Sequence, residues 1–346
     1  MNGIIELRPA EALSLLPRGF LGQIYLWGIE VIKVIQRVES PALTTLVKLF
    51  TNLGSTYFYV PVILIIFLLV DEKRGLRLGI FIIVSAWINS FLKDLWALPR
   101  PYELDASLGL AFEPTYGAPS GHAQMSLCFW VPMGLWLQER VKRRGLLWTG
   151  IICFLLLIGF SRLYLGVHFP SDLFAGWIIA LLLVAGIWFF PGPAVERITG
   201  RMGTRFFNIA AAGLALIMNI LYPGDTSLSG LFLGFCLGYN LMKARFPYSA
   251  REDLKGKKPD LRIMIFRLVI GFVGLGAVYM VFRLLFPGEG SIFSYNPLWG
   301  ESSPYHELGR FVRYALVGFW ASAGAPLLFQ RIGLAVDPES SQETNG

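Results

Sequence analysis

Residues 146–160 read LLWTGIICFLLLIGF, an unbroken apolar run without a charged side chain. Similar blocks occur at Leu173–Phe190 and Phe207–Leu221. With their flanks, such blocks approach or reach the roughly 20 residues that a helix needs to cross a ~30 Å hydrocarbon core. The composition agrees, because 55% of the 346 residues are hydrophobic and 15% are charged, with a mean hydropathy of +0.57. The sequence therefore predicts an all-α polytopic membrane protein built as a transmembrane helical bundle.

The loops between the predicted helices alternate in charge. We predict spanning helices at about 41–70, 76–97, 119–138, 146–165, 171–190, 205–222, 228–242, 262–286 and 309–332. Every second loop is rich in lysine and arginine, and these basic loops lie near 73–77, 140–144, 197–205 and 243–262. The opposite loops hold a single Lys or Arg, Arg100, and they lie near 99–118, 166–170, 223–227 and 287–308. Membrane proteins keep their basic loops in the cytoplasm. The net charge of +7 therefore reflects topology and the lipid bilayer as partner, and a nucleic-acid partner is not expected.

The segment before the first span has a different pattern. In residues 20–37 the apolar side chains recur at helical spacing, and the charged ones cluster elsewhere on the helical wheel. This predicts an amphipathic helix lying in the membrane interface, with a further span as the alternative. The Gly54-Ser55 pair is expected to bend the next element before Tyr57. No removable signal peptide is expected, because the start lacks a basic region followed by an apolar run and a cleavage site.

Two sets of small residues fall inside the predicted helices. A small-xxx-small stripe, formed by Gly230, Gly234 and Gly238, lets neighbouring backbones approach closely. We favour packing within the chain, with a homodimer face as the alternative. The cysteines lack C-x-x-C spacing and are expected to be small buried hydrophobes, without a disulfide or a metal; they are Cys128, Cys153 and Cys236.

The first polar cluster surrounds Lys93 and Arg100. These residues are seven positions apart, which places them on one face of a helix and ~10 Å apart along its axis. Pro99 and Pro101 are expected to end that helix around Arg100. Two cations so placed suit an anion, and the alternative is a snorkelling lysine with an interfacial arginine.

The second cluster is Pro119-Ser120-Gly121-His122, directly before an apolar helix. Ser120 is expected to be the N-cap, and Gly121 leaves its backbone N–H open to a ligand. A helix N-terminus with free N–H groups binds phosphate readily. His122 would stand in the first turn, although a lone histidine there is more often structural.

The third cluster begins with Ser161-Arg162 and continues to His168 and Asp172. Arg162 is expected near the end of one span, and Pro170 suits the first turn of the next helix. Asp172 follows His168 by four residues, so its carboxylate can turn back to the imidazole. A carboxylate on one ring nitrogen fixes the tautomer and leaves the other nitrogen free to attack. Two of the three histidines in the chain thus fall among cations and one carboxylate, which indicates phosphoryl chemistry.

These three clusters closely resemble the signature of the type 2 phosphatidic acid phosphatase (PAP2) superfamily. Its three parts stand here in order as Lys93-x6-Arg100-Pro101, Pro119-Ser120-Gly121-His122 and Ser161-Arg162-x5-His168-x3-Asp172. The resemblance covers about residues 41–190. The C-terminal helices look more like those of sphingosine-1-phosphate phosphatases and related bacterial proteins, although this second likeness is loose.

The resemblance implies a metal-independent membrane phosphatase without a cofactor, acting on a lipid phosphate monoester or diphosphate. It implies that His168 attacks phosphorus, that Asp172 orients it, and that His122 protonates the leaving group and then activates water. It assigns the phosphate oxygens to the side chains and N–H group of Lys93, Arg100, Ser120, Gly121 and Arg162. A lipid-to-lipid phosphotransferase and a transporter are the alternatives. We expect a multi-pass protein of a cell membrane, the bacterial inner membrane, with its active site on the non-cytoplasmic face.

The expected organisation has four parts. Residues 1–40 form an N-terminal segment with the interfacial helix, and residues 41–200 form the PAP2-type catalytic core. Residues 201–335 form a C-terminal transmembrane extension, and residues 336–346 form a disordered tail.

Overall fold

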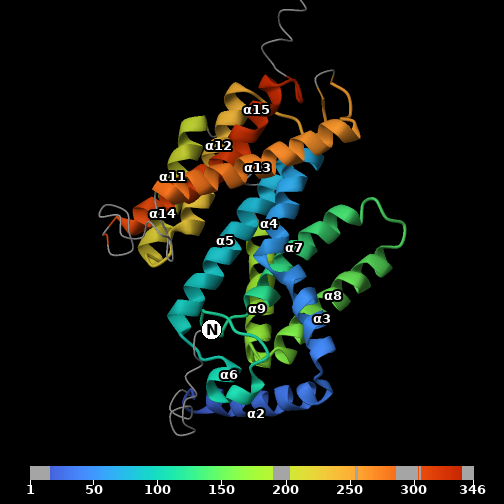
Figure 1. The fold of residues 1–346 in the computed structure, drawn as a ribbon, viewed down its shortest axis with the longest axis vertical. Helices are drawn as coiled ribbons and strands as arrows, with labels where there is room; N and C mark the ends of the chain where they lie inside the picture. Colours follow the sequence, from blue (N-terminus) through green and yellow to red (C-terminus); the bar gives the residue numbers. More distant parts are fainter. Residues whose placement is uncertain (1–15, 190–202, 254–255, 286–302, 304, 337–346) are drawn as a thin grey trace, which may run out of the picture. The chain divides into compact units, whose positions relative to one another are not determined.

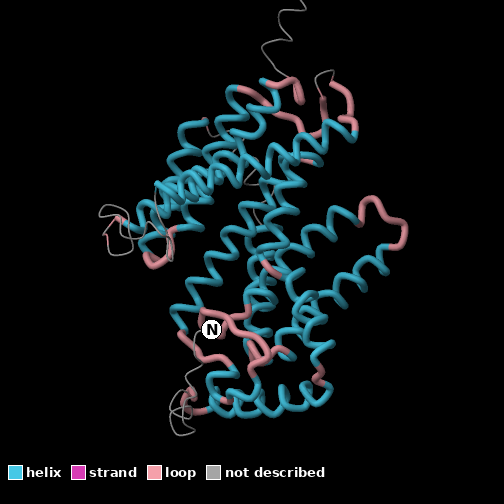
Figure 2. The backbone as a smooth tube through the Cα atoms, viewed as in Figure 1, coloured by secondary structure: helices cyan, strands magenta, loops and turns pink. Residues whose placement is uncertain are grey.

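The fold is helical throughout the part of the chain that can be described. A computed structural model describes residues 16–189, 203–253, 256–285, 303 and 305–336. Figure 2 shows helices and connecting loops, with no strand in those residues. The predicted all-α class is therefore confirmed. The disordered tail predicted for 336–346 lies outside the described residues beyond Val336.

The chain divides into two compact units. Unit 1 comprises Met1–Tyr59 and Ile88–Phe190, and unit 2 comprises Val60–Trp87 and Pro191–Gly346. The helices α4 (Thr56–Ile65) and α5 (Glu72–Trp96) contribute to both. The remaining helices of unit 1 are α2 (Phe20–Ile35), η1 (Gln36–Val38), α3 (Pro41–Thr51), η2 (Asn52–Gly54), α6 (Pro101–Leu104), η4 (Ala106–Leu108), α7 (Gly121–Leu137), α8 (Arg144–Tyr164), α9 (Pro170–Leu183) and η5 (Val184–Phe189). The four-part organisation predicted from the sequence stays a prediction.

Within unit 1, α7 packs against both α8 and α9. The approach of α7 to α9 is close at Gly176, where a Cβ atom would lie 2.6 Å from the Ser120 carbonyl oxygen. Only a glycine fits there, and the contact brings the beginning of α7 to α9. The chain also bends by 45° between Pro41–Gly54 and Thr56–Val70, as the Gly54-Ser55 pair predicted.

The helix α2 runs across the ends of α8 and α9 in Figure 1 and contacts both. It buries Tyr25, Ile29 and Ile32 against Leu108 and Phe169. The Tyr25 ring stacks on the Phe169 ring with 4.1 Å between centroids. This helix is not one of those long and apolar enough to cross a membrane, and its place in the interface stays a prediction.

Unit 2 is a separate set of helices, in which α12 packs between α11 and α14. Its elements are η3 (Ile66–Val70), α11 (Thr204–Leu221), α12 (Ser227–Arg245), α13 (Leu261–Leu285), α14 (His306–Phe319), η6 (Trp320–Gly324) and α15 (Ala325–Arg331). The glycine stripe of α12 faces α14, since a Cβ on Gly234 would lie 2.6 Å from the carbonyl carbon of Ala315 in that helix. The stripe therefore serves packing within the chain, as predicted, and it offers no dimer face.

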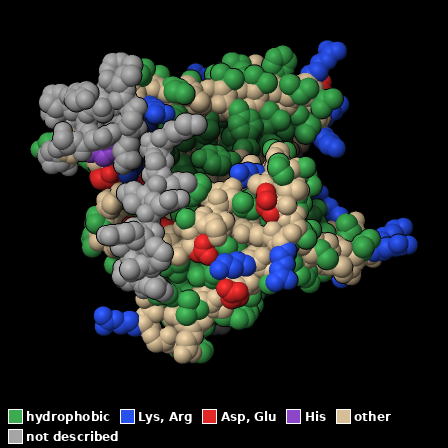
Figure 3. Space-filling view, turned by 60° about the horizontal axis from the view of Figure 1, so that its bottom comes forward, with side chains coloured by type: hydrophobic (Ala, Val, Ile, Leu, Met, Phe, Trp, Pro, Cys, Tyr) green, Lys and Arg blue, Asp and Glu red, His purple; other side chains and the backbone are tan. Residues whose placement is uncertain are grey.

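Several helices could cross a membrane. In the described residues, five helices are long and apolar enough by length and composition, and a sixth span results if the bent pair around Gly54 counts as one. Large hydrophobic side chains are exposed on their outer faces, and on the face shown in Figure 3 hydrophobic side chains are spread between scattered charges. The prediction that all three cysteines are buried is wrong for Cys153, which is exposed because it lies on the outward face of α8. Cys128 and Cys236 are buried, and all three are free thiols.

Candidate active site

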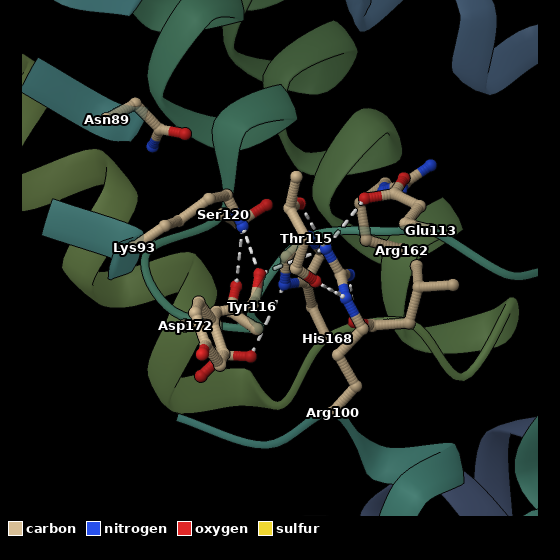
Figure 4. Close-up of polar contacts among 12 residues, drawn as sticks. Asn89, Lys93, Arg100, Glu113, Thr115, Tyr116, Ser120, Arg162, His168 and Asp172 are labelled. Carbon is tan, nitrogen blue, oxygen red and sulfur yellow. Dashed lines mark hydrogen bonds and ion pairs between the residues drawn. The ribbon is translucent and has the colours of Figure 1, made fainter. Parts of the chain in front are cut away.

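The imidazole of His168 lies directly before α9 and contacts a carboxylate of that helix. Pro170 occupies the first turn, as predicted, and Asp172 stands two residues further on. The Asp172 Oδ2 atom accepts a hydrogen bond from the Phe169 N–H at 2.9 Å and lies 3.3 Å from His168 Nδ1. Both side chains are 1% exposed, and Figure 4 shows them together. The carboxylate is thus fixed by capping the helix, and a proton on Nδ1 would leave Nε2 unprotonated.

The loop that carries His168 is fixed from two sides. Its carbonyl at Val167 accepts a hydrogen bond from Arg100 Nη1 at 2.8 Å. On the other side, Gln36 Nε2 donates to the carbonyls of Leu108 and Tyr164 at 2.9 and 2.8 Å. The residue between these anchors, Gly166, has a positive φ of 66°. The segment after α2 therefore helps to position the histidine.

The second cluster lies at the beginning of α7. Ser120 is the N-cap, and its hydroxyl accepts a long hydrogen bond of 3.5 Å from the Ala123 N–H. The N–H of Ser120 donates to the Asp172 carbonyl at 3.0 Å, which joins the starts of α7 and α9. His122 stands in the first turn, with its ring next to Gly54 at the bend after α3. The Gly121 N–H belongs to the first turn, where helical N–H groups have no partner within the helix.

The first cluster does not have the predicted helical geometry. The helix α5 ends at Trp96, and Ala97 has a positive φ of 47°, so Lys93 and Arg100 do not share a helix face. The residue before a proline avoids the helical conformation, which explains why the helix cannot continue to Pro99.

Both cations nevertheless reach the same piece of backbone. Lys93 Nζ donates to the carbonyls of Tyr116 and Gly117, the latter at 3.0 Å. Arg100 donates to the Thr115 carbonyl at 2.6 Å and to the Tyr116 carbonyl at 3.0 Å. The segment 115–117 leads directly into Pro119-Ser120-Gly121-His122, so the first and second clusters meet through it (Figure 4).

Glu113 bridges two arginines. Its Oε2 lies 3.0 Å from Arg100 Nη2, and its Oε1 contacts Arg162 Nη2. The two guanidinium groups are 0% and 3% exposed. Arg162 stands in the last turn of α8, as predicted, and Nη1 donates to Thr51 Oγ1 at 3.0 Å. Its Nε is buried and has no hydrogen-bond partner within the described part of the chain, so a donor is left for an anion.

The surroundings of His168 favour its neutral form. Burial, followed by the charges of Arg100, Lys93 and Arg162, holds the pKa of this imidazole well below its ordinary value. A neutral imidazole keeps a lone pair on the nitrogen that the carboxylate does not hold. The arrangement can therefore supply a nucleophilic nitrogen among positive charges.

The eight residues that the sequence assigned to catalysis or phosphate binding all lie around the starts of α7 and α9. Sequence reasoning missed the residues that hold them in place, which are Gln36, Thr51, Asn89, Glu113, Thr115 and Tyr116. Asn89, for example, donates to the Gln124 side chain at 2.9 Å and to the Pro119 carbonyl at 3.3 Å. In the residues described, no three His, Cys, Asp or Glu side chains lie together as a metal site would need.

A buried histidine and carboxylate among three cations, held by membrane-spanning helices, are the features of an integral-membrane phosphoryl-transfer enzyme. Comparison with known proteins narrows this class. Residues 74–195 match the family model of the PAP2 superfamily, and residues 226–337 match that of the PAP2 superfamily phosphatase, transmembrane extension. The chain therefore carries a PAP2 superfamily domain followed by the transmembrane extension of PAP2 superfamily phosphatases, and it is a multi-pass membrane enzyme of the phosphoric monoester hydrolase type.

Three relatives illustrate the range of the similarity. Sphingosine-1-phosphate phosphatase 1 of Rattus norvegicus is 25% identical over 320 residues, covering 82% of this chain and 71% of that protein. Undecaprenyl-diphosphatase of Sulfolobus acidocaldarius is 28% identical over 167 residues, or 44% and 73% of the two chains. Phosphatidylglycerophosphatase B of Bacillus subtilis is 28% identical over 156 residues, or 42% and 74%. The first similarity covers most of this chain, whereas the other two cover less than half of it.

Proposed function

We propose that the protein hydrolyses the phosphate monoester or diphosphate of a membrane lipid through a phosphohistidine formed on His168. The observation that carries this proposal is the buried contact of His168 Nδ1 with Asp172 Oδ2, at 3.3 Å. This contact leaves Nε2 as the nucleophile, and burial, together with the surrounding cations, lowers the pKa of the imidazole and so favours an unprotonated Nε2.

The reaction has two steps. In the first, a bond forms between Nε2 and phosphorus while the bond from phosphorus to the leaving oxygen breaks, and His122 donates a proton to that oxygen. In the second, His122 accepts a proton from water, the water oxygen bonds to phosphorus, the bond from Nε2 to phosphorus breaks, and inorganic phosphate leaves. His122 thus acts as a general acid in the first step, and the base that this leaves acts as a general base in the second step.

The cations hold the phosphoryl group. Lys93, Arg100 and Arg162, with the Ser120 hydroxyl and the Gly121 N–H, are assigned to its oxygens. Phosphoryl transfer depends mainly on in-line positioning and on positive charge around the equatorial oxygens. Three fixed cations supply the charge that magnesium supplies in other enzymes, so we propose a reaction that needs no metal.

The substrate is proposed to be an amphiphile that enters from the bilayer. The relatives are named for sphingosine 1-phosphate, undecaprenyl diphosphate and phosphatidylglycerophosphate. A sphingoid-base phosphate is supported by the similarity that covers 82% of this chain. We further propose that the enzyme resides in the bacterial inner membrane. The site is proposed to lie on the non-cytoplasmic face, because the loops at 99–118 and 166–170 hold a single Lys or Arg, Arg100.

A trapping experiment tests the mechanism with two matched histidine variants. A ³²P-labelled ester with a good leaving group, such as nitrophenyl phosphate, needs no acid for the first step. His122→Asn should therefore accumulate labelled protein that is acid-labile and base-stable, whereas His168→Ala should stay unlabelled and release phosphate about 10³-fold more slowly or worse. Labelling of His168→Ala, or turnover within tenfold of wild type, would remove His168 from its role.

A release assay tests the substrate. Purified protein is given each lipid phosphate in mixed micelles, and inorganic phosphate is measured together with any phosphorylated acceptor lipid. Release of phosphate into water is expected. Transfer to a second lipid without release would contradict hydrolysis and favour the phosphotransferase.

A further inference from the structure

The carboxylate of Glu113 occupies the two arginines that the proposed function assigns to phosphate. Its Oε2 atom lies 3.0 Å from Arg100 Nη2, and its Oε1 atom contacts Arg162 Nη2 (Figure 4). Both guanidinium groups are buried, whereas the Glu113 side chain is 26% exposed. The carboxylate is thus the accessible partner of two buried cations, and a phosphoryl group that takes the same Nη2 atoms must displace it.

The other partners of Arg100 belong to the fold itself. Its Nε donates to the Thr115 carbonyl, its Nη1 to the Val167 carbonyl, and its Nη2 to the Tyr116 carbonyl and the Thr115 hydroxyl. A ligand cannot move backbone carbonyls aside as it can move a long side chain. Glu113 is therefore the partner of Arg100 that an anion can replace.

Arg162 has a similar division of partners. Its Nη1 donates to Thr51 Oγ1 at 3.0 Å, and its Nη2 contacts Glu113. Its Nε is buried and has no hydrogen-bond partner within the described residues. A ligand that replaces the carboxylate can therefore take both Nε and Nη2 of one guanidinium group. Such paired hydrogen bonds are the geometry in which arginine binds phosphate.

The backbone of Glu113 is anchored, although its side chain is accessible. The Tyr102 hydroxyl donates to the Glu113 carbonyl at 2.9 Å and accepts from the Glu113 N–H at 3.4 Å. The Tyr102 ring meets the Phe112 ring edge to face, with 5.0 Å between centroids. Displacement of the carboxylate therefore needs a rotation of the Glu113 side chain about its own bonds, without movement of the loop.

The exchange of this carboxylate for a phosphate depends on charge. A phosphate monoester carries a charge of about −1.5 to −2 at pH 7 and three terminal oxygens. A phosphodiester carries one negative charge, as the carboxylate does. Because Coulomb energy scales with the product of the charges, a monoester gains up to about twice as much from the same cations. A diester gains no more than the carboxylate that it replaces, and it also loses freedom of motion on binding.

This difference matters in a bilayer, where anionic phosphodiester lipids surround the enzyme. We propose that Glu113 is a specificity-determining residue, which holds Arg100 and Arg162 in the empty enzyme and releases them to a phosphate monoester but not to a phosphodiester lipid. The inference rests on the proposed function, because it takes both arginines as ligands of the phosphoryl group.

The test measures competition, with full-length protein in detergent micelles. Nitrophenyl phosphate is the substrate, inorganic phosphate is the soluble inhibitor, and phosphatidylglycerol is the phosphodiester. Diacylglycerol with the same acyl chains is the uncharged lipid control. Glu113→Gln keeps the shape of the side chain and removes its charge. The matched control is Glu103→Gln, which removes an equal charge from an exposed side chain whose Oε2 accepts from the Arg100 N–H at 2.7 Å, a bond that glutamine can also accept.

Phosphatidylglycerol should not inhibit wild type or Glu103→Gln, even as the main lipid of the micelle, and it should compete with the substrate in Glu113→Gln. In that variant KM for nitrophenyl phosphate and the inhibition constant of inorganic phosphate should both fall about tenfold, because a carboxylate no longer competes for charge-assisted hydrogen bonds. A merely structural role has the opposite sign, since poorly ordered arginines would raise both constants. Diacylglycerol should have no effect on any of the proteins.

Three results would overturn the proposal. The first is an inhibition constant of phosphate that is unchanged or raised in Glu113→Gln. The second is an equal fall in Glu103→Gln, which would make the effect one of total charge. The third is inhibition of wild type by phosphatidylglycerol as strong as that of Glu113→Gln, a result that needs no stable variant.

Phosphate binding is also measured as a rise in the thermal midpoint, which needs no turnover. An enzyme that hydrolyses no monoester would contradict the proposed function, and the midpoints would still compare Glu113→Gln with wild type. Unchanged phosphate affinity in an enzyme that hydrolyses monoesters would contradict the role of Glu113 alone.

Discussion

Replacing Gly166 with alanine tests how strictly the loop before His168 is positioned. Gly166 has a positive φ of 66°, and a Cβ atom there would lie 2.7 Å from the carbonyl carbon of Leu108 and still closer to its oxygen. An L-residue pays roughly 1–2 kcal/mol in this conformation. The contact with Leu108 is an additional cost, because backbone cannot swing away as a flexible side chain can.

The loss in the free energy of unfolding follows from the contacts that the alanine side chain displaces. Ordinary contact needs at least 3.4 Å, so the loop and Leu108 must separate by about 1 Å. That shift breaks or lengthens the bridge from Gln36 to the Leu108 and Tyr164 carbonyls, which is worth about 0.5–1.5 kcal/mol for each bond. Together with the backbone strain, the loss is about 3 kcal/mol, or roughly 4 °C in the thermal midpoint of a chain of 346 residues. A 1 Å displacement of a reacting group costs about 10²-fold in rate, and His168 stands two residues further on.

The assay compares Gly166→Ala with Gly150→Ala. Gly150 lies in α8 of the same unit, and a Cβ there meets nothing within 4 Å. Alanine inside a helix is up to ~1 kcal/mol better than glycine, so the control should melt no lower than wild type. Thermal midpoints and kcat/KM on a soluble ester are measured for both. A Gly166→Ala enzyme with kcat/KM within twofold of wild type and an unchanged midpoint would refute the argument that this loop positions the nucleophile.

Four further outcomes are expected. The acid limb of kcat/KM, which reports the free enzyme, should lie below pH 6.5, because a depressed pKa keeps His168 neutral until the pH falls further; a limb above that pH would contradict this. Activity should persist in EDTA and be inhibited by vanadate, a mimic of five-coordinate phosphorus, and a strict requirement for Mg²⁺ would exclude the cation cradle. Glu113→Gln should lower the thermal midpoint by the equivalent of about 1–3 kcal/mol, because two buried guanidinium groups lose their shared carboxylate. Added inorganic phosphate should restore part of this loss, and a midpoint of the variant that phosphate does not raise would argue against phosphate binding there. With the exposed Cys153 changed to Ser, an impermeant thiol reagent should label Ser107→Cys in intact cells and spare Lys257→Cys, and the reverse pattern would overturn the topology.

Features set by neighbours in sequence could be predicted. The carboxylate of Asp172 reaches His168 because four residues make about one helical turn, and Pro170 marks where that turn begins. The N-cap at Ser120 and the bend at Gly54 depend on equally short ranges. The long apolar blocks predicted the helical class for the same reason.

Features that depend on distant contacts could not be predicted. Glu113 meets Arg162 across 49 residues, and Gln36 meets the Tyr164 carbonyl across 128. Nothing in the spacing of the signature indicates either partner. The prediction that Lys93 and Arg100 share a helix face was wrong for a local reason, because the helix ends at Trp96, four residues before Arg100. Both side chains reach the carbonyls of 115–117 because the loop after Arg100 folds back toward them, and the spacing of residues in the sequence does not predict that fold.

The manner in which the cations are held explains why the site can attract phosphate at all. A buried guanidinium or ammonium group needs partners, because burying an unpaired charge is costly. Here Lys93 and Arg100 take most of their partners from backbone carbonyls at Thr115, Tyr116 and Gly117, which satisfy the donors without cancelling the charge. Carboxylates on every cation would have stabilised the empty site and left little attraction for an anion. Carbonyl partners thus keep the arginine and lysine side chains ordered without adding negative charge beside them, which preorganises the donors that phosphoryl transfer requires.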